Sequence, residues 1–247
     1  MEGGINDWDY PMFRRRLGLT LRNLVQMGVI VAAINAGLTG AAMAAGGEKG
    51  KDKIKLVAFG DSLTAGYGVR PSESFPVQLE AALRAKGLNI EVVNSGVSGD
   101  TASAGLERFD WAVPDDADAV ILELGANDAL RGVAPEQTNA TLDSLLTRLA
   151  ERKLPVLLTG MLAPKNWGDD YANKFDAIYP ALATKHIVML YPFFLDGVIM
   201  DRTLNQGDGI HPTGKGVAVI VSRILPKVEE LIAKVNPRPG TAASAKQ

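Results

Sequence analysis

Short apolar runs alternate with amphipathic helical patterns through residues 55–234, and this rhythm constrains the fold more than any other feature of the chain. The runs lack the polar alternation of a half-exposed strand, so each is expected to be buried on both faces of a parallel sheet. The expected strands are residues 55–59, 90–93, 119–124, 156–158 and 187–190. The sequence therefore predicts one α/β domain, a three-layer α/β/α sandwich around a five-stranded parallel sheet.

Helices are expected between the strands, at residues 75–86, 138–152, 171–183 and 217–233. Pro76 suits the first turn of the first helix, and Gly87 suits its C-terminal stop. Pro226 predicts a bend in the last helix, because proline removes a backbone hydrogen bond. In such a sheet the binding site lies beyond the carboxyl ends of the strands.

The two ends of the chain differ in composition from the middle. Arginines at 14–16 and 22 precede an apolar stretch that ends in Ala42-Met43-Ala44, the pattern of a secretory signal peptide. We expect residues 1–44 to be that signal peptide, with an uncleaved anchor as the alternative because the apolar stretch is long. Residues 45–53 are then a short linker, 54–235 the domain and 236–247 a disordered tail. The expected location is periplasmic or secreted.

Composition excludes several classes of function. The chain carries 26 basic and 28 acidic residues without a basic stripe that could neutralise a phosphate backbone, so nucleic acid is not an expected partner. The absence of cysteine removes disulfides and thiolate chemistry. No cluster of His, Asp and Glu has metal-ligand spacing, and no phosphate-loop or dinucleotide motif occurs, so neither a metal nor a cofactor is expected.

The chain has two histidines, and only His211 has a carboxylate close by, in Asp208-Gly209-Ile210-His211-Pro212. A turn bounded by Gly and Pro can fold Asp208 back onto the imidazole, which would fix its tautomer and stabilise its charged form. The alternative is an ordinary polar loop. His186 has no acidic neighbour in the sequence and is interpreted as structural.

Polar segments that contain glycine follow the first three predicted strands. They are Gly60-Asp61-Ser62-Leu63-Thr64, residues 94–101, and Gly125-Ala126-Asn127-Asp128. The turn with His211 lies between the last strand and the last helix. Because the carboxyl ends of parallel strands meet at one edge of the sheet, we expect all four segments to converge there.

The converging segments carry what acyl transfer needs. Ser62 is a weak nucleophile until a base takes its proton, and His211, oriented by Asp208, is the available base. The N–H groups of Ser62 and Gly99 and the side-chain amide of Asn127 can donate to a developing oxyanion. Turn-forming or helix-capping roles are the alternative for the serine, the glycine and the asparagine.

Neighbouring polar residues are assigned other roles. Gly96 lies close to Gly99 in sequence and is the alternative source of the oxyanion N–H. Asp61 is expected to brace the turn through hydrogen bonds rather than act as a second catalytic carboxylate, and Asp128 is expected to be structural. No G-x-S-x-G motif surrounds Ser62, which argues against the nucleophile turn of α/β-hydrolases.

Taken in order, these blocks resemble the SGNH, or GDSL, hydrolase family over residues 55–234. The resemblance places the nucleophile on Ser62, the oxyanion glycine on Gly99 and the oxyanion asparagine on Asn127. It places the family's Asp–His pair on Asp208 and His211. Residues 122–132, 177–180 and 191–194 are similar to the bacterial periplasmic thioesterase I/lysophospholipase/arylesterase group of that family.

The resemblance implies a flavodoxin-like sandwich that hydrolyses small-molecule acyl esters and thioesters through an acyl-enzyme, without a cofactor. It also implies a mobile loop at about residues 129–135, whose Leu130 and Val133 would contact the acyl chain. No stable protein partner is implied, and membrane contact is expected only if the N-terminal segment stays uncleaved. The alternatives are a carbohydrate O-acetylesterase on the same site and a non-catalytic protein that binds an apolar ligand.

Overall fold

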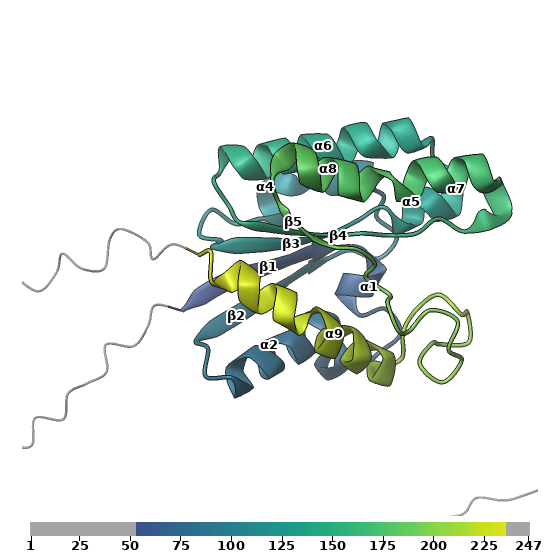
Figure 1. Cartoon of the computed structure of the whole chain (residues 1–247). Coiled ribbons are helices and arrows are strands. Elements are labelled where there is room, and N and C mark those ends of the chain that lie inside the picture. Colours follow the sequence, from purple (N-terminus) through teal and green to yellow (C-terminus); the bar gives the residue numbers. More distant parts are fainter. Residues whose placement is uncertain (1–52, 236–247) are drawn as a thin grey trace, which may run out of the picture. The chain divides into compact units, whose positions relative to one another are not determined.

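The centre of the fold is a parallel sheet of five strands in the order β2-β1-β3-β4-β5, covered by helices on both faces (Figure 1). The computed structural model describes residues 53–235, so the expected signal peptide and tail lie outside the described residues. Every neighbouring pair of strands is parallel. The predicted three-layer α/β/α architecture is therefore confirmed.

Each predicted strand is present, and only β2 and β5 differ from the prediction by more than one residue at an end. The strands are β1 (Ile54–Gly60), β2 (Ile90–Gly96), β3 (Ala119–Glu123), β4 (Val156–Thr159) and β5 (Met189–Tyr191). All five residues of β3 are buried, as expected for an unalternated apolar run. β2 continues past the predicted end to Gly96, which pairs with Gly60. β5 begins late because Ile187 has a left-handed conformation (φ 55°) and is 91 % exposed.

The helices form a layer on each side of the sheet (Figure 1). α2 (Phe75–Ala85) and α9 (Gly214–Ile232) pack against each other on one face. On the other face, α6 (Pro135–Glu151) packs against α3 (Ala102–Glu107) and α8 (Ile178–His186). α6 buries one stripe of its surface at the three- and four-residue spacing of an amphipathic helix: Leu142, Leu145, Leu146 and Leu149.

Proline explains where one predicted helix divides. The segment expected as a single helix at residues 171–183 forms α7 (Asp169–Asp176) and α8, which are separated at Ala177. Pro180 has no N–H to donate to the carbonyl four residues earlier, so a continuous helix would lose a hydrogen bond there. Pro226 lies inside α9, which nevertheless continues to Ile232.

Several short helices were not predicted. They are α1 (Ser62–Ala65), α3, α4 (Phe109–Ala112) and α5 (Ala126–Arg131), together with 3₁₀ turns at Pro71–Glu73 and Lys165–Trp167. A helix of four to six residues is too short to show a hydrophobic period in the sequence. Two of them, α1 and α5, directly follow strands, so they determine where the polar side chains at the strand ends lie.

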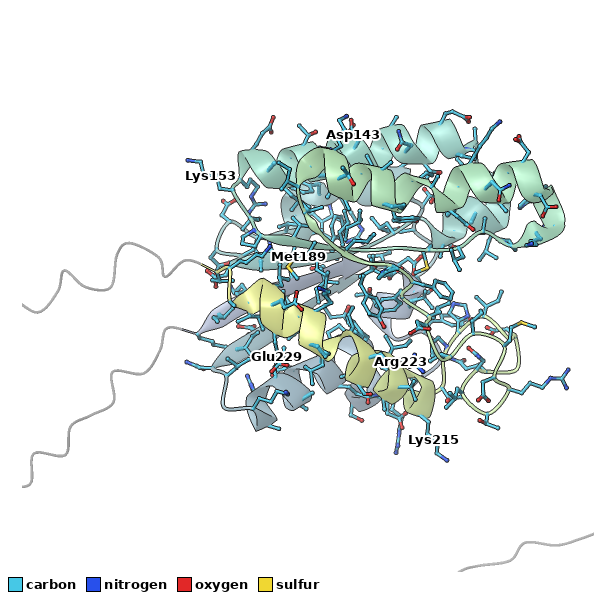
Figure 2. The ribbon with its side chains drawn as sticks, in the orientation of Figure 1. Asp143, Lys153, Met189, Lys215, Arg223 and Glu229 are labelled. Atoms are coloured by element: carbon cyan, nitrogen blue, oxygen red, sulfur yellow. The ribbon has the colours of Figure 1, made fainter. Side chains whose placement is uncertain are left out.

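Charged side chains cover the outer surfaces of both helical layers, as Figure 2 shows for Asp143 on α6 and for Arg223 and Glu229 on α9. Asp143 accepts from His186 Nε2 at 2.6 Å, so the histidine without an acidic neighbour in sequence has one in space. This pair links α6 to α8, which agrees with a structural role for His186. Within residues 53–235, no helix combines the length and hydrophobicity needed to cross a membrane.

Candidate active site

The turn between β1 and α1 holds Ser62 at the start of a short helix. Asp61 caps this helix, because its Oδ1 accepts from the Leu63 N–H at 3.0 Å. As the first residue of α1, Ser62 has no acceptor within the helix for its own N–H, which is left for an acceptor outside it. Only 9 % of Ser62 is exposed, so most of the serine is shielded from water.

Asp208 and His211 share one tight turn between β5 and α9, as predicted. Asp208 Oδ1 accepts from the N–H groups of Ile210 and His211 at 2.9 and 3.0 Å, and Oδ2 accepts from His211 Nδ1 at 2.6 Å. These hydrogen bonds, the side-chain one first, lower the pKa of Asp208 to about 2. The carboxylate is therefore ionised throughout the neutral range and holds the His211 proton on Nδ1.

The fold brings this turn to the turn that holds Ser62, although Ser62 and His211 are 149 residues apart in sequence. His211 Nε2 lies 2.9 Å from Ser62 Oγ, so the unprotonated nitrogen accepts from the serine hydroxyl. The three side chains Ser62, His211 and Asp208 thus form one continuous hydrogen-bonded chain. This geometry suits removal of the serine proton by the imidazole.

Gln206 and Tyr67 support the base turn. The Gln206 N–H donates to the His211 carbonyl at 2.7 Å, and its Nε2 donates to the carbonyls of Tyr67 and Pro212 at 2.8 and 2.9 Å. The Tyr67 ring lies 4.6 Å from the imidazole between centroids, at an interplanar angle of 42°. Gln206 therefore links the Asp208–His211 turn to Tyr67, in the segment that follows α1.

Asn127, the second residue of α5, reaches the same region. Its Nδ2 donates to Asp61 Oδ2 and to the Asp100 carbonyl, both at 3.0 Å. Because both neighbouring atoms are acceptors, the amide nitrogen rather than its oxygen must face them. Both N–H bonds of the amide are thus occupied, and one of them would have to leave its acceptor before it could bind an oxyanion.

Gly96 and Gly99 differ in the space around their Cα atoms and in whether their N–H groups have an acceptor. The Gly96 N–H donates to Asn94 Oδ1 at 3.0 Å, and a Cβ at Gly96 would collide with the backbone of Ala65 and Asp61. Gly99 has a left-handed backbone (φ 89°), and a Cβ there would meet nothing nearer than Arg131 Nη2 at 3.8 Å. No acceptor for the Gly99 N–H occurs among the described residues. Gly96 is therefore used for packing, whereas Gly99 keeps a free donor.

A buried carboxyl, that of Glu123, contacts the two residues Asp61 and Thr64 of the turn that holds Ser62. As the last residue of β3 it is 0 % exposed, and its Oε2 accepts from Thr64 Oγ1 at 2.8 Å and from the Asp61 N–H at 3.2 Å. Burial raises the pKa of Glu123 well above its usual range, and the charge of Asp61 raises it further. Burial also raises the pKa of Asp61, to about 6. Two carboxyl groups therefore share one desolvated space beside Ser62.

Arg108 forms hydrogen bonds to the carboxyl ends of both β1 and β2. It is 5 % exposed and donates to the carbonyls of Gly60 and Ser95 at 2.8 and 2.9 Å and to Asp100 Oδ2 at 2.5 Å. Its guanidinium also lies 4.6 Å from the centroid of the Phe59 ring. Arg108 therefore fixes the loop whose Asp100 carbonyl accepts from Asn127.

The segment after Asn127, expected as a loop at about residues 129–135, is partly helical. Residues 129–131 belong to α5, and Pro135 already begins α6. Trp167 Nε1 donates to the Ala129 carbonyl at 2.9 Å, and the Tyr171 hydroxyl donates to the Val133 carbonyl at 2.8 Å. Leu130 is 43 % exposed and Val133 is half-buried, so both are accessible near the site.

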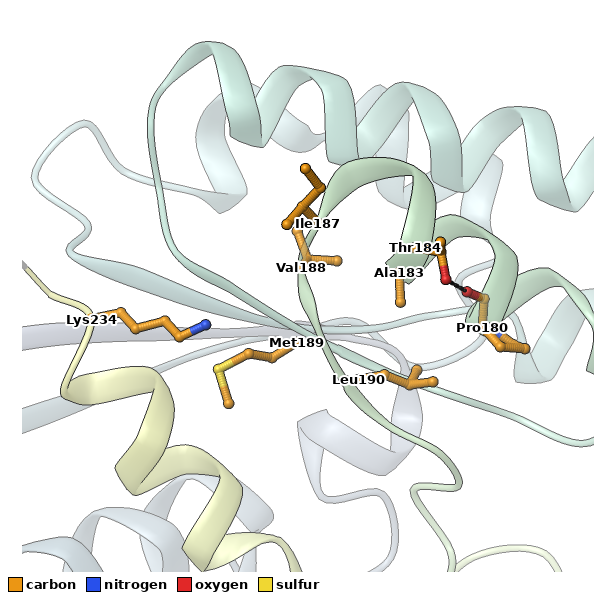
Figure 3. A pocket seen from close by; sticks show the side chains of 8 residues that line it. All are labelled: Pro180, Ala183, Thr184, Ile187, Val188, Met189, Leu190 and Lys234. Atoms are coloured by element: carbon orange, nitrogen blue, oxygen red, sulfur yellow. Dashed lines mark hydrogen bonds between the residues drawn. The ribbon is translucent and has the colours of Figure 1, made fainter.

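The remaining polar residues have structural partners. Asp128 is 2 % exposed and accepts from the Ala102 N–H at 2.8 Å and Thr138 Oγ1 at 3.2 Å, which fits the structural role expected for it. A groove of about 500 Å³ lies elsewhere, between the end of α8, β5 and Lys234 (Figure 3), and no predicted site residue lines it. Among residues 53–235, no group of three or more His, Asp or Glu could hold a metal ion.

Sequence reasoning missed four residues of the site: Glu123, Arg108, Gln206 and Tyr67. A signal existed for Glu123, because an acid inside an otherwise apolar strand is rarely buried without a specific role. The other three act through contacts between segments distant in sequence, for which the sequence carries no local pattern.

Known proteins share both the sequence and the fold of this chain. The sequence profile of the GDSL-like lipase/acylhydrolase family matches residues 58–219. Esterase TesA of Pseudomonas aeruginosa is 35 % identical over 178 residues, covering 72 % of this chain and 89 % of that protein. Thioesterase 1/protease 1/lysophospholipase L1 of Escherichia coli is 36 % identical over 178 residues, covering 72 % of this chain and 84 % of that protein.

Solved structures agree with this assignment. The crystal structure of AlinE4, an SGNH-hydrolase family esterase, is 46 % identical with a TM-score of 0.62 and covers 72 % of this chain and 96 % of that chain. The crystal structure of TesA has a TM-score of 0.68 at 34 % identity and covers 72 % of this chain and 99 % of that chain. The chain therefore belongs to the GDSL-like lipase/acylhydrolase family, the SGNH hydrolases, and is an ester hydrolase.

Proposed function

We propose that this protein is a serine esterase that cleaves acyl esters and thioesters through an acyl-enzyme on Ser62. The observation that carries the proposal is the hydrogen-bonded chain from Ser62 Oγ to His211 Nε2, at 2.9 Å, and from His211 Nδ1 to Asp208 Oδ2, at 2.6 Å. A non-catalytic binding protein would not need a base within hydrogen-bonding distance of a shielded serine hydroxyl.

The reaction follows from the positions of the three side chains. His211 Nε2 takes the hydroxyl proton as Ser62 Oγ bonds to the acyl carbon, and the imidazolium is stabilised by the ionised Asp208. The tetrahedral intermediate collapses with cleavage of the C–O or C–S bond, and the imidazolium gives its proton to the leaving alcohol or thiol. Water then attacks the acyl-enzyme by the same route, which releases the acid and restores Ser62.

Three donors support the developing oxyanion. The Ser62 N–H begins a helix, and the Gly99 N–H has no acceptor among the described residues, so both are free to donate. Asn127 supplies the third donor if one of its N–H bonds leaves its present acceptor. A carboxylate accepts more strongly than a neutral carbonyl, so we expect the bond to Asp61 to persist and the bond to the Asp100 carbonyl to open. The hydrogen bonds of a catalytic site often tighten or rearrange only when substrate binds.

The proposed substrates have an apolar acyl group. Leu130 follows Asn127 on α5 and is 43 % exposed, and Val133 lies just beyond the helix, so both are placed to contact an acyl chain that leaves the oxyanion site. Relatives named arylesterase, thioesterase and lysophospholipase support a substrate of this class. The proposed location is periplasmic or secreted, on the basis of the signal pattern in residues 1–44.

A fluorophosphonate probe and an acyl-length series test the proposal. The probe should label the purified protein on Ser62, and Ser62→Ala should remove both the label and turnover. With p-nitrophenyl esters, kcat/KM should rise from acetate towards medium chains, and Leu130→Asn should lower the value for the longer chains more than for acetate. Turnover that survives Ser62→Ala would contradict the serine mechanism, and a sharp optimum at acetate would favour an O-acetylesterase instead.

A further inference from the structure

Glu123, at the end of β3, is linked to Asn127 through Asp61: the Asp61 N–H donates to Glu123, and the Asp61 carboxylate accepts from Asn127. Its Oε2 accepts two hydrogen bonds, from Thr64 Oγ1 and the Asp61 N–H, as the carbonyl oxygen of a carboxylic acid would. Its other oxygen, Oε1, is buried and has no donor facing it among the described residues. An ionised oxygen in that position would be buried without a partner, which is costly.

Asp61 is the carboxyl that lies beside Glu123, because its own N–H donates to Glu123 Oε2 at 3.2 Å. Two neighbouring carboxyl groups can form a hydrogen bond only if one of them carries a proton. Asp61 already accepts from Leu63 and Asn127 on its two oxygens, so Asp61 is suited to be the charged member. Glu123 is equally buried but has one oxygen, Oε1, without a donor among the described residues, so it is suited to be the neutral donor.

We propose that Glu123 is a positioning residue that stays protonated beneath the nucleophile turn, donates to the Asp61 carboxylate and thereby holds the Asn127 amide at the oxyanion site. The inference rests on the proposed function, because it assigns Asn127 to the oxyanion. The chain of contacts runs from the buried end of β3 through the cap of α1 to the first turn of α5. Glu123 touches neither the reacting atoms nor the substrate and acts only through Asp61.

Two substitutions of Glu123 test whether its side chain acts as a neutral hydrogen-bond donor or as an anion. Glu123→Gln keeps an acceptor for Thr64 and the Asp61 N–H and keeps a donor for the Asp61 carboxylate, but it cannot ionise. Glu123→Met keeps the volume and removes both functions. Thr64→Val is the matched control, because it removes a buried hydrogen bond to Glu123 without changing the contact between Glu123 and Asp61.

Steady-state kinetics with p-nitrophenyl butyrate provide the main readout, with thermal unfolding to confirm folding. Glu123→Gln should keep kcat within about threefold of the wild type. Glu123→Met should lower kcat by about 10- to 100-fold with KM within about twofold, because a misplaced donor weakens binding of the transition state only. Thr64→Val should lower the melting temperature while leaving kcat within about threefold.

A double-mutant cycle shows whether Glu123 acts through Asn127. On an Asn127→Ala background, Glu123→Met should cost less than about threefold in kcat, since the amide that it positions is already gone. An equal cost on both backgrounds, or wild-type kcat in Glu123→Met, would overturn the proposal. So would a Glu123→Gln variant that folds but has lost activity, which would show that the charge is needed. If Glu123→Met does not fold, the stability of Glu123→Gln relative to the wild type decides: a difference that stays constant between about pH 5 and pH 7 would show that Glu123 ionises in the folded protein and would overturn the proposal. Failure of the proposed function is distinct from all of these results, because it would appear in the wild type as missing esterase activity or missing label on Ser62.

Discussion

The part of the site around Asp61, Ser62 and Glu123, the buried side, packs against the sheet. The turn with Asp208 and His211, the exposed side, lies nearer the surface. Asp61 and Glu123 have no exposed surface, and Ser62 is 9 % exposed. The side chain of Asp208, by contrast, is 39 % exposed, and its turn is held by a few hydrogen bonds, chiefly those of Gln206. Burial fixes one half of the site and local hydrogen bonds fix the other, so the two halves should respond differently to substitution.

The largest effect tests whether the two sides work as a unit. Ser62→Ala and His211→Ala should each lower kcat by about 10⁴-fold or more, and the double variant should be no slower than the worse single variant. Proton transfer needs both partners, so removal of the second costs nothing further. The measurement is single-turnover and steady-state ester hydrolysis, with thermal unfolding to show that each variant folds. Additive losses would mean that the serine and the imidazole contribute independently.

Asp208→Asn breaks the exposed side alone. An amide cannot stabilise the imidazolium and favours the wrong tautomer, so kcat should fall by about 10²- to 10⁴-fold. The free energy of unfolding should fall by less than in a variant of the buried side, because solvent screens the charge of Asp208 and the amide oxygen still accepts from the Ile210 and His211 N–H groups. Asp61→Asn on the buried side is the contrast, and it should lower both kcat and stability, since the new NH2 group would face one of the two donors, the Leu63 N–H or Asn127 Nδ2. Equal stability losses in the two variants would remove the distinction between the two sides.

The pH dependence of stability sharpens the description of the buried side. The pKa of Glu123 is raised in the folded state, so between the pKa of the unfolded chain and that of the folded protein the folded form binds one more proton. Stability then falls as pH rises, by about 1.4 kcal/mol per pH unit for one proton. Glu123→Gln removes this contribution, so its stability relative to the wild type should increase between about pH 5 and pH 7.

Urea unfolding of the wild type, Glu123→Gln and Thr64→Val across that pH range measures the effect. Thr64→Val carries no titrating group, so its difference from the wild type should stay constant with pH if Glu123 remains protonated. A constant difference for Glu123→Gln as well would mean that Glu123 ionises in the folded protein as it does in the unfolded chain. The exposed side contributes in the opposite direction, because the lowered pKa of Asp208 stabilises the fold above about pH 4 and is lost in acid.

The smallest effect concerns the support of the exposed turn. Gln206→Ala removes the two side-chain hydrogen bonds to Tyr67 and Pro212, so kcat should fall by severalfold, roughly two- to tenfold, through looser placement of His211. Thr203→Ala, in the same exposed segment, removes a bond to Asp201 only and should leave kcat unchanged. Equal kcat in the two variants would show that the turn keeps its geometry without Gln206.

Much of the fold and part of the site followed from the sequence, because both have local signatures. Buried parallel strands leave apolar runs, and the residues after them, such as Ser62 and Asn127, are brought to one edge by the topology itself. The contact between Ser62 and His211 could be expected because few other bases exist in the chain. The helical conformation of residues 129–131, inside the loop predicted at 129–135, had no local signature, since Trp167 from a distant segment bonds to the Ala129 carbonyl of α5.

The parts that could not be predicted depend on contacts across the chain. Arg108 and the Gly60 carbonyl are separated by 48 residues, and Asp61 and Glu123 by 62, so no local spacing announces either contact. The difference between Gly96 and Gly99 is likewise a matter of space: only the packing of α1 on β2 shows that Gly96 has no room and no free N–H. Contacts between residues close in sequence produce recognisable sequence patterns, whereas contacts between distant segments, such as those of Arg108 and Glu123, do not.

The separation of Ser62 and His211 along the chain has a consequence for refolding. Ser62 and the proposed oxyanion donors come from segments that follow β1, β2 and β3, whereas His211 lies after β5, just before the final helix. During refolding, the circular dichroism of the sheet can therefore recover while ester hydrolysis is still absent. Recovery of turnover marks the moment at which residues 205–213 dock. A chain truncated before His211 would have no esterase activity, however much of the sheet it had formed.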